Sequence, residues 1–218
     1  MTLLNIVNEE EDYLYTEASF KKLKTYKKNI AVLKNLVLDK KSVFIDVGFH
    51  RGEELHYLKD IGCRVYGFEV NPLHFENVKR IYANYKQIRL FQNAVTNTSG
   101  KKIDCYYKNS PGLGGSMSIE PGKHNNDLER KIEVETIKLS EFIRSKRHKK
   151  ISFVKLDAEG AEFKIIEDLI DSGMIDRVNI VFLEDHHGKI NCPEWKKHRE
   201  IVRQKMVNTC PEKFYLWE

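Results

Sequence analysis

The sequence predicts a doubly wound α/β fold built around a mostly parallel sheet. Five short, nearly continuous apolar runs, which are typical of strands buried on both faces, alternate with longer amphipathic segments. These runs are SVFIDVG, RVYGFEV, IRLFQNAV, ISFVKLDA and VNIVFLED. Since a chain of 218 residues can form one good hydrophobic core, we expect a single domain.

The segments between and after the runs have the pattern of helices. They read GEELHYLKDIG, PLHFENVKRIYANYK, GAEFKIIEDLIDSG and PEWKKHREIVRQKMVN, and the chain closes with the strand-like KFYLWE. Pro72 opens the second segment, where the first turn of a helix tolerates proline, and Gly173 closes the third. Apolar residues at steps of three and four predict a further helix over residues 18–38. We therefore expect an N-terminal helical extension over residues 1–40, followed by the main domain over residues 41–218.

The segment from Gly100 to Leu139 interrupts the alternation. In its stretches KKIDCYYK and KIEVETIKL, apolar and polar residues alternate with period two. These stretches flank a glycine- and serine-rich loop, NSPGLGGSMSIEPGKHNND. This pattern predicts an inserted, hairpin-like β excursion. Long loops of this kind often cover a ligand, so Ser116 and Ser118 are candidate substrate-binding residues, although the glycines could equally reflect a tight turn.

Composition and charge indicate a globular protein of modest net charge. Apolar residues make up 41% of the chain, and the formal charge is +5. The densest basic block, Arg144 to Lys150, precedes the fourth run and is therefore placed at the amino edge of the sheet. Such a block could bind nucleic acid, but most charge runs are solvated. We predict a solvated loop.

Several absences bear on location. No apolar run is long enough to span a membrane, and the first residues lack the basic-then-apolar order of a signal peptide. The cysteines lie far apart without metal-binding spacing, which predicts free thiols in a reducing compartment. They are Cys63, Cys105, Cys192 and Cys210. We expect no membrane span and a cytoplasmic location.

A pair of glycines directly after the first apolar run indicates a ligand site. Gly48 and Gly52 let the backbone turn tightly and approach a ligand, and the following helix offers unpaired N–H groups. The pattern GxxxG does not meet the dinucleotide fingerprint GxGxxG, so a pyrophosphate is not expected. Glu69 ends the second run about twenty residues later, where a carboxylate can accept hydrogen bonds from both ribose hydroxyls. Together these features predict a nucleoside ligand such as S-adenosylmethionine, although a structural turn and a surface carboxylate remain alternatives.

Six stretches of the chain, in order, resemble the FkbM family of S-adenosylmethionine-dependent methyltransferases. They are FIDVGFHRGEEL, VYGFEVNP, QNAVTNTSG, GGSMSI, FVKLDAEGAEF and FLEDHH, within Val43 to His187. The most specific is KLDAEGAE, Lys155 to Glu162, which is similar to the family's Lys-(Ile/Val)-Asp-x-Glu-Gly-x-Glu block. The chain departs from the family at His50, commonly Asn, and at Val70, commonly Pro. The resemblance implies a Rossmann-like sheet of the class I methyltransferase type.

The resemblance also implies how the cofactor is held. The first loop would hold the methionine part, the end of the second strand the ribose, and the end of the third strand the adenine. The implied residues, in that order, are Asp46, Gly48, His50 and Gly52, then Glu69, then Asn93 and Ala94. The Asp46 carboxylate could accept a hydrogen bond from the cofactor's ammonium group, orient the loop backbone, or only cap the turn.

Ionisable residues follow the fourth and fifth runs and are candidates for catalysis. Methyl transfer to a hydroxyl requires removal of the acceptor's proton, because an alcohol is a poor nucleophile. We predict His186 or Asp157 as the base, with Glu159 positioning the acceptor or the base. The remaining candidates for substrate binding, beside the two loop serines, are Asp185 and His187.

Two alternatives for these residues stay open. A divalent metal held by Asp157, Asp185 and a neighbour would lower the pKa of the acceptor hydroxyl, although no metal is predicted. Glu184 and His187 could merely cap the next segment.

The acceptor can be predicted only from the resemblance. FkbM-like proteins typically O-methylate hydroxyls of sugars and other secondary metabolites, which implies a glycan or glycolipid sugar, such as the deoxyhexoses rhamnose or fucose. A nucleic-acid amino-methyltransferase would carry an Asp/Asn/Ser-Pro-Pro-aromatic block where LDAEGAE stands, so no nucleic-acid partner is predicted. The alternatives are a non-sugar small molecule, a nucleic acid, or a nucleoside-binding module without catalysis. Because the family usually adds strands after FYLWE, the chain could also belong to a larger glycan-building polypeptide.

Overall fold

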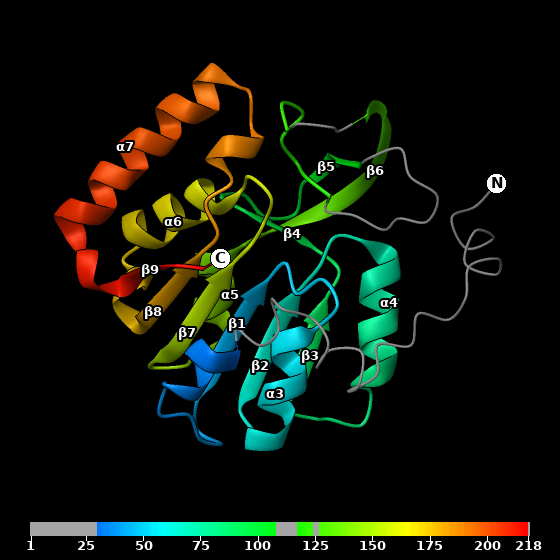
Figure 1. The fold of residues 1–218 in the computed structure, drawn as a ribbon, viewed down its shortest axis with the longest axis vertical. Coiled ribbons are helices and arrows are strands. Elements are labelled where there is room, and N and C mark those ends of the chain that lie inside the picture. Colours follow the sequence, from blue (N-terminus) through cyan, green and yellow to red (C-terminus); the bar gives the residue numbers. More distant parts are fainter. Residues whose placement is uncertain (1–29, 108–116, 124–126, 218) are drawn as a thin grey trace.

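Six parallel strands form the central sheet in the order β3-β2-β1-β7-β8-β9 (Figure 1). The computed structural model describes residues 30–107, 117–123 and 127–217. The strands are β1 (Val43–Val47), β2 (Arg64–Phe68), β3 (Ile88–Phe91), β7 (Ile151–Leu156), β8 (Val178–Leu183) and β9 (Phe214–Leu216). The chain runs outward from β1 to β3, returns to the centre, and runs outward again from β7 to β9. This confirms the predicted doubly wound α/β fold, with its switch point between β1 and β7.

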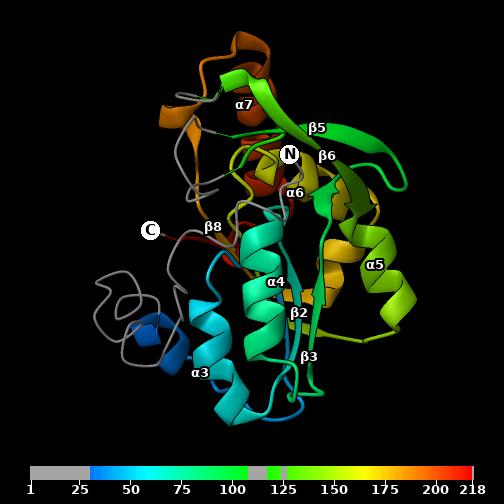
Figure 2. The ribbon, with the colours of Figure 1, turned by 90° about the vertical axis from the view of Figure 1, so that its right-hand side faces the viewer.

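Helices cover both faces of the sheet (Figures 1 and 2). Side chains in β1 alternate between two cores, because successive residues of a strand point to opposite faces. Phe44 packs with the side chains of α3 and α4, whereas Ile45 packs with those of α5, α6 and α7. The helices are α3 (Glu53–Ile61), α4 (Pro72–Ile81), α5 (Leu139–Lys146), α6 (Glu162–Asp171) and α7 (Pro193–Thr209), with the short 3-10 helices η2 (Met174–Arg177), η3 (His187–Lys189) and η4 (Pro211–Lys213).

A second, three-stranded sheet forms the predicted β excursion. Its order is β4 (Ala94–Thr96), β6 (Asp127–Lys138), β5 (Lys102–Tyr107), with β5 antiparallel and β4 parallel to β6. The run IRLFQNAV was predicted as one strand and is two, since β3 belongs to the main sheet and β4 to the second. The chain changes sheet at Asn93, whose side-chain amide donates to the Glu135 carbonyl of β6. Ser116 lies outside the described residues.

Helix α5 is not predicted from the sequence, and part of the basic block belongs to it. Arg144 to Lys146 form its last turn, and the Lys146 ammonium lies 4.7 Å from the centre of the Phe142 ring. Arg147 ends the helix with a left-handed φ of 56°. The prediction of a loop is therefore wrong for residues 144–146, whereas most of the block is exposed to solvent as predicted and precedes β7 at the amino edge.

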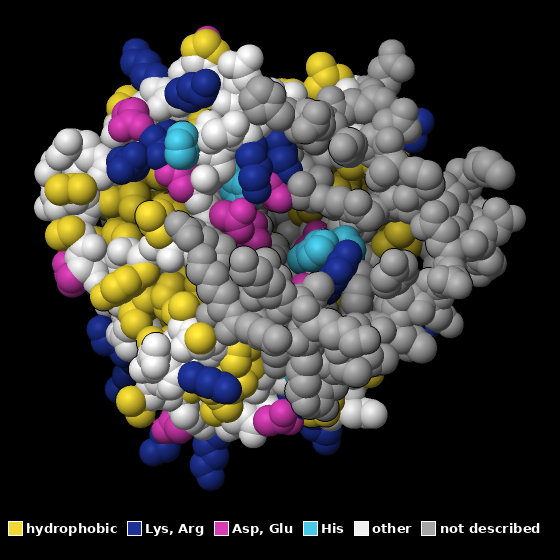
Figure 3. All heavy atoms as spheres, viewed as in Figure 1, with side chains coloured by type: hydrophobic (Ala, Val, Ile, Leu, Met, Phe, Trp, Pro, Cys, Tyr) yellow, Lys and Arg dark blue, Asp and Glu magenta, His cyan; other side chains and the backbone are white. Residues whose placement is uncertain are grey.

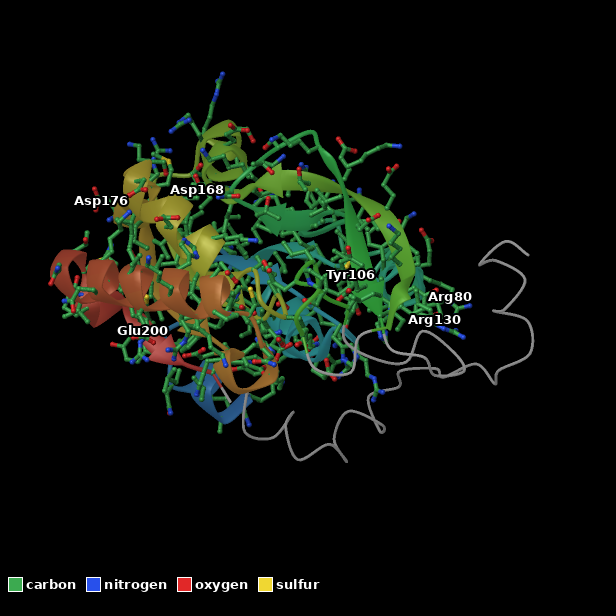
Figure 4. The ribbon with its side chains drawn as sticks, turned by 90° about the horizontal axis from the view of Figure 1, so that it is seen from above. Arg80, Tyr106, Arg130, Asp168, Asp176 and Glu200 are labelled. Carbon is green, nitrogen blue, oxygen red and sulfur yellow. The ribbon has the colours of Figure 1, made fainter. Side chains whose placement is uncertain are left out.

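Asp168 joins α5 to α6 (Figure 4). Its buried carboxylate accepts hydrogen bonds from the backbone N–H and the hydroxyl of Ser140, at 3.0 and 2.8 Å. It also lies 3.1 Å from the Lys138 ammonium at the end of β6. These contacts tie the second sheet and α5 to the helix that begins at the candidate site.

Three smaller predictions can be compared with the structure. Of the helix predicted over residues 18–38, residues 30–34 are helical, residues 35–38 are not, and residues 18–29 lie outside the described residues. All four cysteines are described and are free thiols, as predicted. Within the described ranges, no helix combines the length and the apolar character needed to cross a membrane.

Candidate active site

The candidate residues gather at the carboxyl edge of the central sheet. Residues 48–52 follow β1, Glu69 follows β2, residues 157–162 follow β7, and residues 184–187 follow β8. Parallel strands end at the same edge, and ligands of doubly wound folds bind there, at the switch point. Two of the three described non-glycine residues with positive φ lie in these segments, His50 at 47° and Glu159 at 52°. Because such backbone is strained, its concentration here supports a functional site.

The β1 loop approaches the end of β7 too closely for any side chain at position 48. Gly48 has a φ of 80°, and a Cβ atom added there would lie 1.9 Å from the Asp157 carbonyl oxygen. The Gly48 N–H donates to the Phe68 carbonyl at 2.9 Å, which ties the loop to the end of β2. Gly52, also with positive φ, is the N-cap of α3. The loop is thus fixed between the two neighbouring strands.

Glu69 is held in a fixed orientation at the end of β2. One carboxylate oxygen accepts from the His50 N–H at 2.9 Å, and the other from the Asn71 N–H at 2.8 Å. Burial raises the pKa of Glu69, whereas these hydrogen bonds lower it. Since each carboxylate oxygen can accept more than one hydrogen bond, both can still accept from a vicinal diol. This carboxylate, which accepts hydrogen bonds and donates none, lies beside the β1 loop and fits the ribose of a nucleoside cofactor.

Asp46 is joined to Lys155, a residue whose role the sequence analysis missed. The two residues are opposite each other in the β1–β7 register, and both are buried. The Lys155 ammonium donates to the Gly48 carbonyl at 3.0 Å and lies 3.4 Å from carboxylate oxygens of Asp46 and Asp157. Burial raises the pKa of Asp46 to about 8, whereas Lys155 lowers it. With its side chain 0% exposed, Asp46 supports the loop through Lys155, and its contact with the cofactor's ammonium group stays a prediction.

His186 is buried at the end of β8, with its ring fixed by Glu162. Its Nδ1 lies 2.8 Å from a Glu162 oxygen, and because a carboxylate only accepts, Nδ1 donates. Glu162 is itself fully buried at the start of α6 and accepts from the N–H groups of Ala158 and Gly160. These bonds turn Nε2 toward the end of β7.

Three carboxylates surround Nε2 of His186. Oxygens of Glu159, Glu184 and Asp157 lie at 3.0, 3.3 and 3.7 Å. Burial lowers the pKa of His186, but the nearby carboxylates of Glu159, Glu162 and Glu184 outweigh it and raise the pKa to about 12. The carboxylates therefore favour the protonated form of His186 while no cation is bound, and its role as the base stays a prediction.

The two carboxylates after β7 differ in their surroundings. Burial raises the pKa of Asp157 to about 7, against the lowering effect of Lys155. For Glu159, burial also raises the pKa, but His186 and Lys123 lower it well below its usual range. The Lys123 ammonium lies 2.6 Å from Glu159 Oε2. Asp157, whose side chain is 23% exposed, is the better candidate for proton transfer.

Three residues predicted to bind the substrate have other contacts in the structure. Ser118 is buried, and its hydroxyl donates to the Glu159 carbonyl at 2.6 Å, so it supports the turn after β7. Asp185 accepts from the Arg199 guanidinium of α7 at 3.0 Å. His187 is 62% exposed and lies 3.5 Å from Asp185. Asp185 and His187 both line a groove between α7 and β9, so their contact with a substrate stays a prediction. The three described residues whose possible metal-ligand atoms lie together are Asp157, Glu159 and His186, without Asp185.

The residues predicted beside the adenine lie between the two sheets. Asn93 uses its amide to bind β6, and Ala94 is buried in the core of the second sheet. Their contact with adenine stays a prediction. Trp195, which the sequence analysis also missed, donates its indole N–H to the Gly160 carbonyl at 2.7 Å and so holds the same turn as Ser118.

An apolar groove opens beside the cluster. Figure 3 shows acidic, basic and histidine side chains gathered near the middle of one face, next to a hydrophobic patch. The groove has a volume of about 700 Å³ and runs between α7 and β9. Its lining includes Glu184, Phe214, Tyr215 and Trp217. Apolar and aromatic walls with a few polar groups at one end are typical of small-molecule sites.

Enzymes that bind a nucleoside cofactor at the carboxyl edge of a parallel sheet share this arrangement of fold and site. The model of the FkbM methyltransferase domain matches residues 46–206. Because this match covers most of the chain, the protein belongs to the FkbM family of methyltransferases, and S-adenosylmethionine is its cofactor. No curated protein matches the chain.

Comparison with solved structures gives more distant likenesses. YjhP from E. coli has 19% identity and a TM-score of 0.29, with 42% of this chain and 37% of that chain covered. Aeropyrum pernix fibrillarin with bound S-adenosyl-L-methionine has 13% identity and a TM-score of 0.36, with 67% and 49% covered. A methyltransferase from Aquifex aeolicus has 13% identity and a TM-score of 0.38, with 87% and 82% covered. The chain thus spans less than half the length of the first two, and at such TM-scores the family match alone carries the assignment.

Proposed function

We propose that the protein transfers the methyl group of S-adenosylmethionine to a hydroxyl of a sugar, in a glycan or glycolipid. The observation that carries this proposal is the carboxylate cluster beside the cofactor strands. Asp157 and Glu159 follow β7, the strand next to β1, so an acceptor bound by them would lie close to a cofactor on the β1 loop. Carboxylates of this kind bind hydroxyl groups, and the aromatic groove beside Glu184 suits the apolar faces of a sugar or its aglycone.

In the proposed reaction, each of the following residues has a separate role. Glu69 binds the ribose hydroxyls, while the loop of Gly48, His50 and Gly52 holds the methionine part. S-adenosylmethionine, when bound, supplies an electrophilic methyl group. Asp157 would take the proton from the acceptor hydroxyl, because positioned acid–base groups speed such steps. The acceptor oxygen would gain the methyl group as the S–CH₃ bond breaks and S-adenosylhomocysteine leaves. Glu159 positions the acceptor, and His186 is a positioning residue that holds Glu159 and Glu184.

Glu69→Ala is expected to weaken cofactor binding on the order of 100-fold. The variant loses hydrogen bonds from two ribose hydroxyls to a charged group, together about 3 kcal/mol, and each 1.4 kcal/mol is a factor of ten. Calorimetric titration with S-adenosylhomocysteine measures the change. The control is Glu76→Ala, an exposed carboxylate on α4, which we expect to bind as the wild type does. Equal affinities for all three proteins would remove the ribose contact from the proposal.

The function itself is tested by methyl transfer to a panel of glycosides. We expect a gain of one methyl group on a sugar hydroxyl, detected by mass spectrometry, together with release of S-adenosylhomocysteine. Asp157→Asn should lower kcat by about 10²- to 10⁴-fold and leave the affinity for S-adenosylhomocysteine unchanged, as expected for loss of a proton acceptor. Asp171→Asn, an exposed aspartate on α6, is the control. Methylation of an amine or a nucleic acid, with no sugar accepted, would contradict the proposal.

A further inference from the structure

We propose that Asp157, Glu159 and His186 form a binding site for a divalent transition-metal cation such as Mn²⁺. One carboxylate oxygen of each acid and one ring nitrogen of His186 lie within 4.8 Å of one another. The separations fit a shared ion, since two ligands at right angles, each about 2.1 Å from the ion, are about 3.0 Å apart. Nε2 of His186 lies 3.0 Å from Glu159 Oε2 and 3.7 Å from Asp157 Oδ1.

The histidine is oriented as metal-binding histidines are. Nδ1 donates to Glu162, which leaves Nε2 as the atom turned toward the carboxylates. Metal-bound histidines commonly donate their other N–H to a carboxylate in this manner. The ring of His186 is 0% exposed, and among the described residues Nε2 has no hydrogen bond of acceptable geometry. A buried polar atom aimed at two or three carboxylates, without a hydrogen bond of its own, points to a cation between them. The bound cation would take the place of the proton that Nε2 holds while the site is empty.

The carboxylate side of the site is fixed by its turn. Glu159 has a left-handed φ of 52°, which turns its side chain back over the end of β7. Ser118 holds the Glu159 carbonyl, and Trp195 holds the Gly160 carbonyl. Ligands held by such supporting contacts before the ion arrives lose little conformational freedom on binding.

The donor set selects the class of ion. Two carboxylates suit Mg²⁺ and Mn²⁺, and an imidazole suits the transition metals, whereas no thiolate is present among the three donors to favour a softer ion. Mn²⁺ satisfies both preferences. An alcohol bound to such an ion becomes more acidic, so the ion would assist proton removal if the proposed O-methylation is correct. The binding site itself does not depend on that function.

Lys123 is the group with which a cation would compete. Its buried ammonium lies 2.6 Å from Oε2 of Glu159, the oxygen that faces His186. A divalent ion bound to this oxygen must displace Lys123 or share the oxygen with it. Replacing Lys123 by methionine should therefore strengthen metal binding.

The test is a titration of the full chain with Mn²⁺, in which electron paramagnetic resonance measures the free ion. We expect one Mn²⁺ ion per chain. The affinity for Mn²⁺ should fall about 100-fold or more in His186→Gln. It should fall about 10- to 100-fold in Glu162→Gln, because loss of an outer-shell carboxylate has that effect. Lys123→Met should bind several-fold more tightly. The matched control is His198→Gln, since His198 also pairs with a carboxylate, Glu167, at 2.8 Å, and its variant should bind as the wild type does.

Three results would overturn the metal site. They are no binding of Mn²⁺ at millimolar concentration, unchanged binding in His186→Gln, or an equal loss in His198→Gln. Thermal melting shows whether each variant folds. If the variant of the buried His186 does not fold, Glu159→Gln replaces it in the test, since the Glu159 side chain is 17% exposed. The same loss of Mn²⁺ affinity is expected for Glu159→Gln. The titration measures Mn²⁺ binding without turnover, and methyl transfer to the glycosides is measured both with and without Mn²⁺, so failure of one proposal can be told from failure of the other.

Discussion

Gly48→Ala is expected to lower the free energy of unfolding by about 2 to 5 kcal/mol, or to prevent folding. The added Cβ would lie 1.9 Å from the carbonyl oxygen of Asp157. That oxygen is a backbone atom, so relief requires a shift of the β1 loop or of the end of β7. Left-handed backbone at a non-glycine residue adds about 1–2 kcal/mol, and overpacking adds about 1–3 kcal/mol. Guanidinium denaturation measures the loss through the transition midpoint.

The matched control is Gly100→Ala. Gly100 also has a positive φ, 68°, but nothing lies within 4 Å of a Cβ atom added there. Its variant should therefore show only the backbone cost, about 1–2 kcal/mol. The difference between the two variants reports the close approach of the β1 loop to β7. Equal losses would show that this approach does not exist in solution.

Lys155→Met is expected to destabilise the protein by about 3 to 5 kcal/mol. Removing one partner of a buried ion pair leaves an uncompensated charge, which is the costly case. Here the carboxylates of Asp46 and Asp157 would lose the ammonium that lies 3.4 Å from each, and the Gly48 carbonyl would lose its donor. Chemical denaturation at about pH 9, where Asp46 and Asp157 are ionised in the wild type, gives the loss. Adding Asp46→Asn to this variant should recover part of it, because the charge left behind is then removed.

A surface lysine provides the comparison. Lys205 pairs with Asp171 at 2.7 Å but is 31% exposed, and its partner is 56% exposed. Lys205→Met should cost about 0–1 kcal/mol, as exposed ion pairs do. If Lys155→Met cost no more than this, or if the double variant were no more stable than Lys155→Met alone, the buried network would not support the β1 loop as described.

The main sheet could be predicted because its strands are buried on both faces and so read as continuous apolar runs. The strand IRLFQNAV was predicted as one element because its polar pair, Gln92 and Asn93, gives no local sign that the chain passes to another sheet. Helix α5 was missed, although Leu139, Phe142 and Ile143 have helical spacing. The charge of the following residues obscured that signal.

The site could be located from the sequence, but the partners of its side chains could not. Position follows from a simple rule, because residues after parallel strands meet at one edge. Partners depend on register and on turn geometry, which only the folded chain provides. Asp46 meets Lys155 because the two strands pair in that register. The adjacent residues Asp185 and His186 turn to different neighbours, one to Arg199 on α7 and the other to Glu162 on α6.

The most direct measurement is a crystal structure of the protein with S-adenosylhomocysteine. We predict that both ribose hydroxyls lie within hydrogen-bond distance of the Glu69 carboxylate and that the amino-acid end of the ligand lies along the loop from Gly48 to Gly52. The ligand's sulfur should then face the end of β7. A ligand bound elsewhere, or one that contacts neither Glu69 nor this loop, would contradict the account.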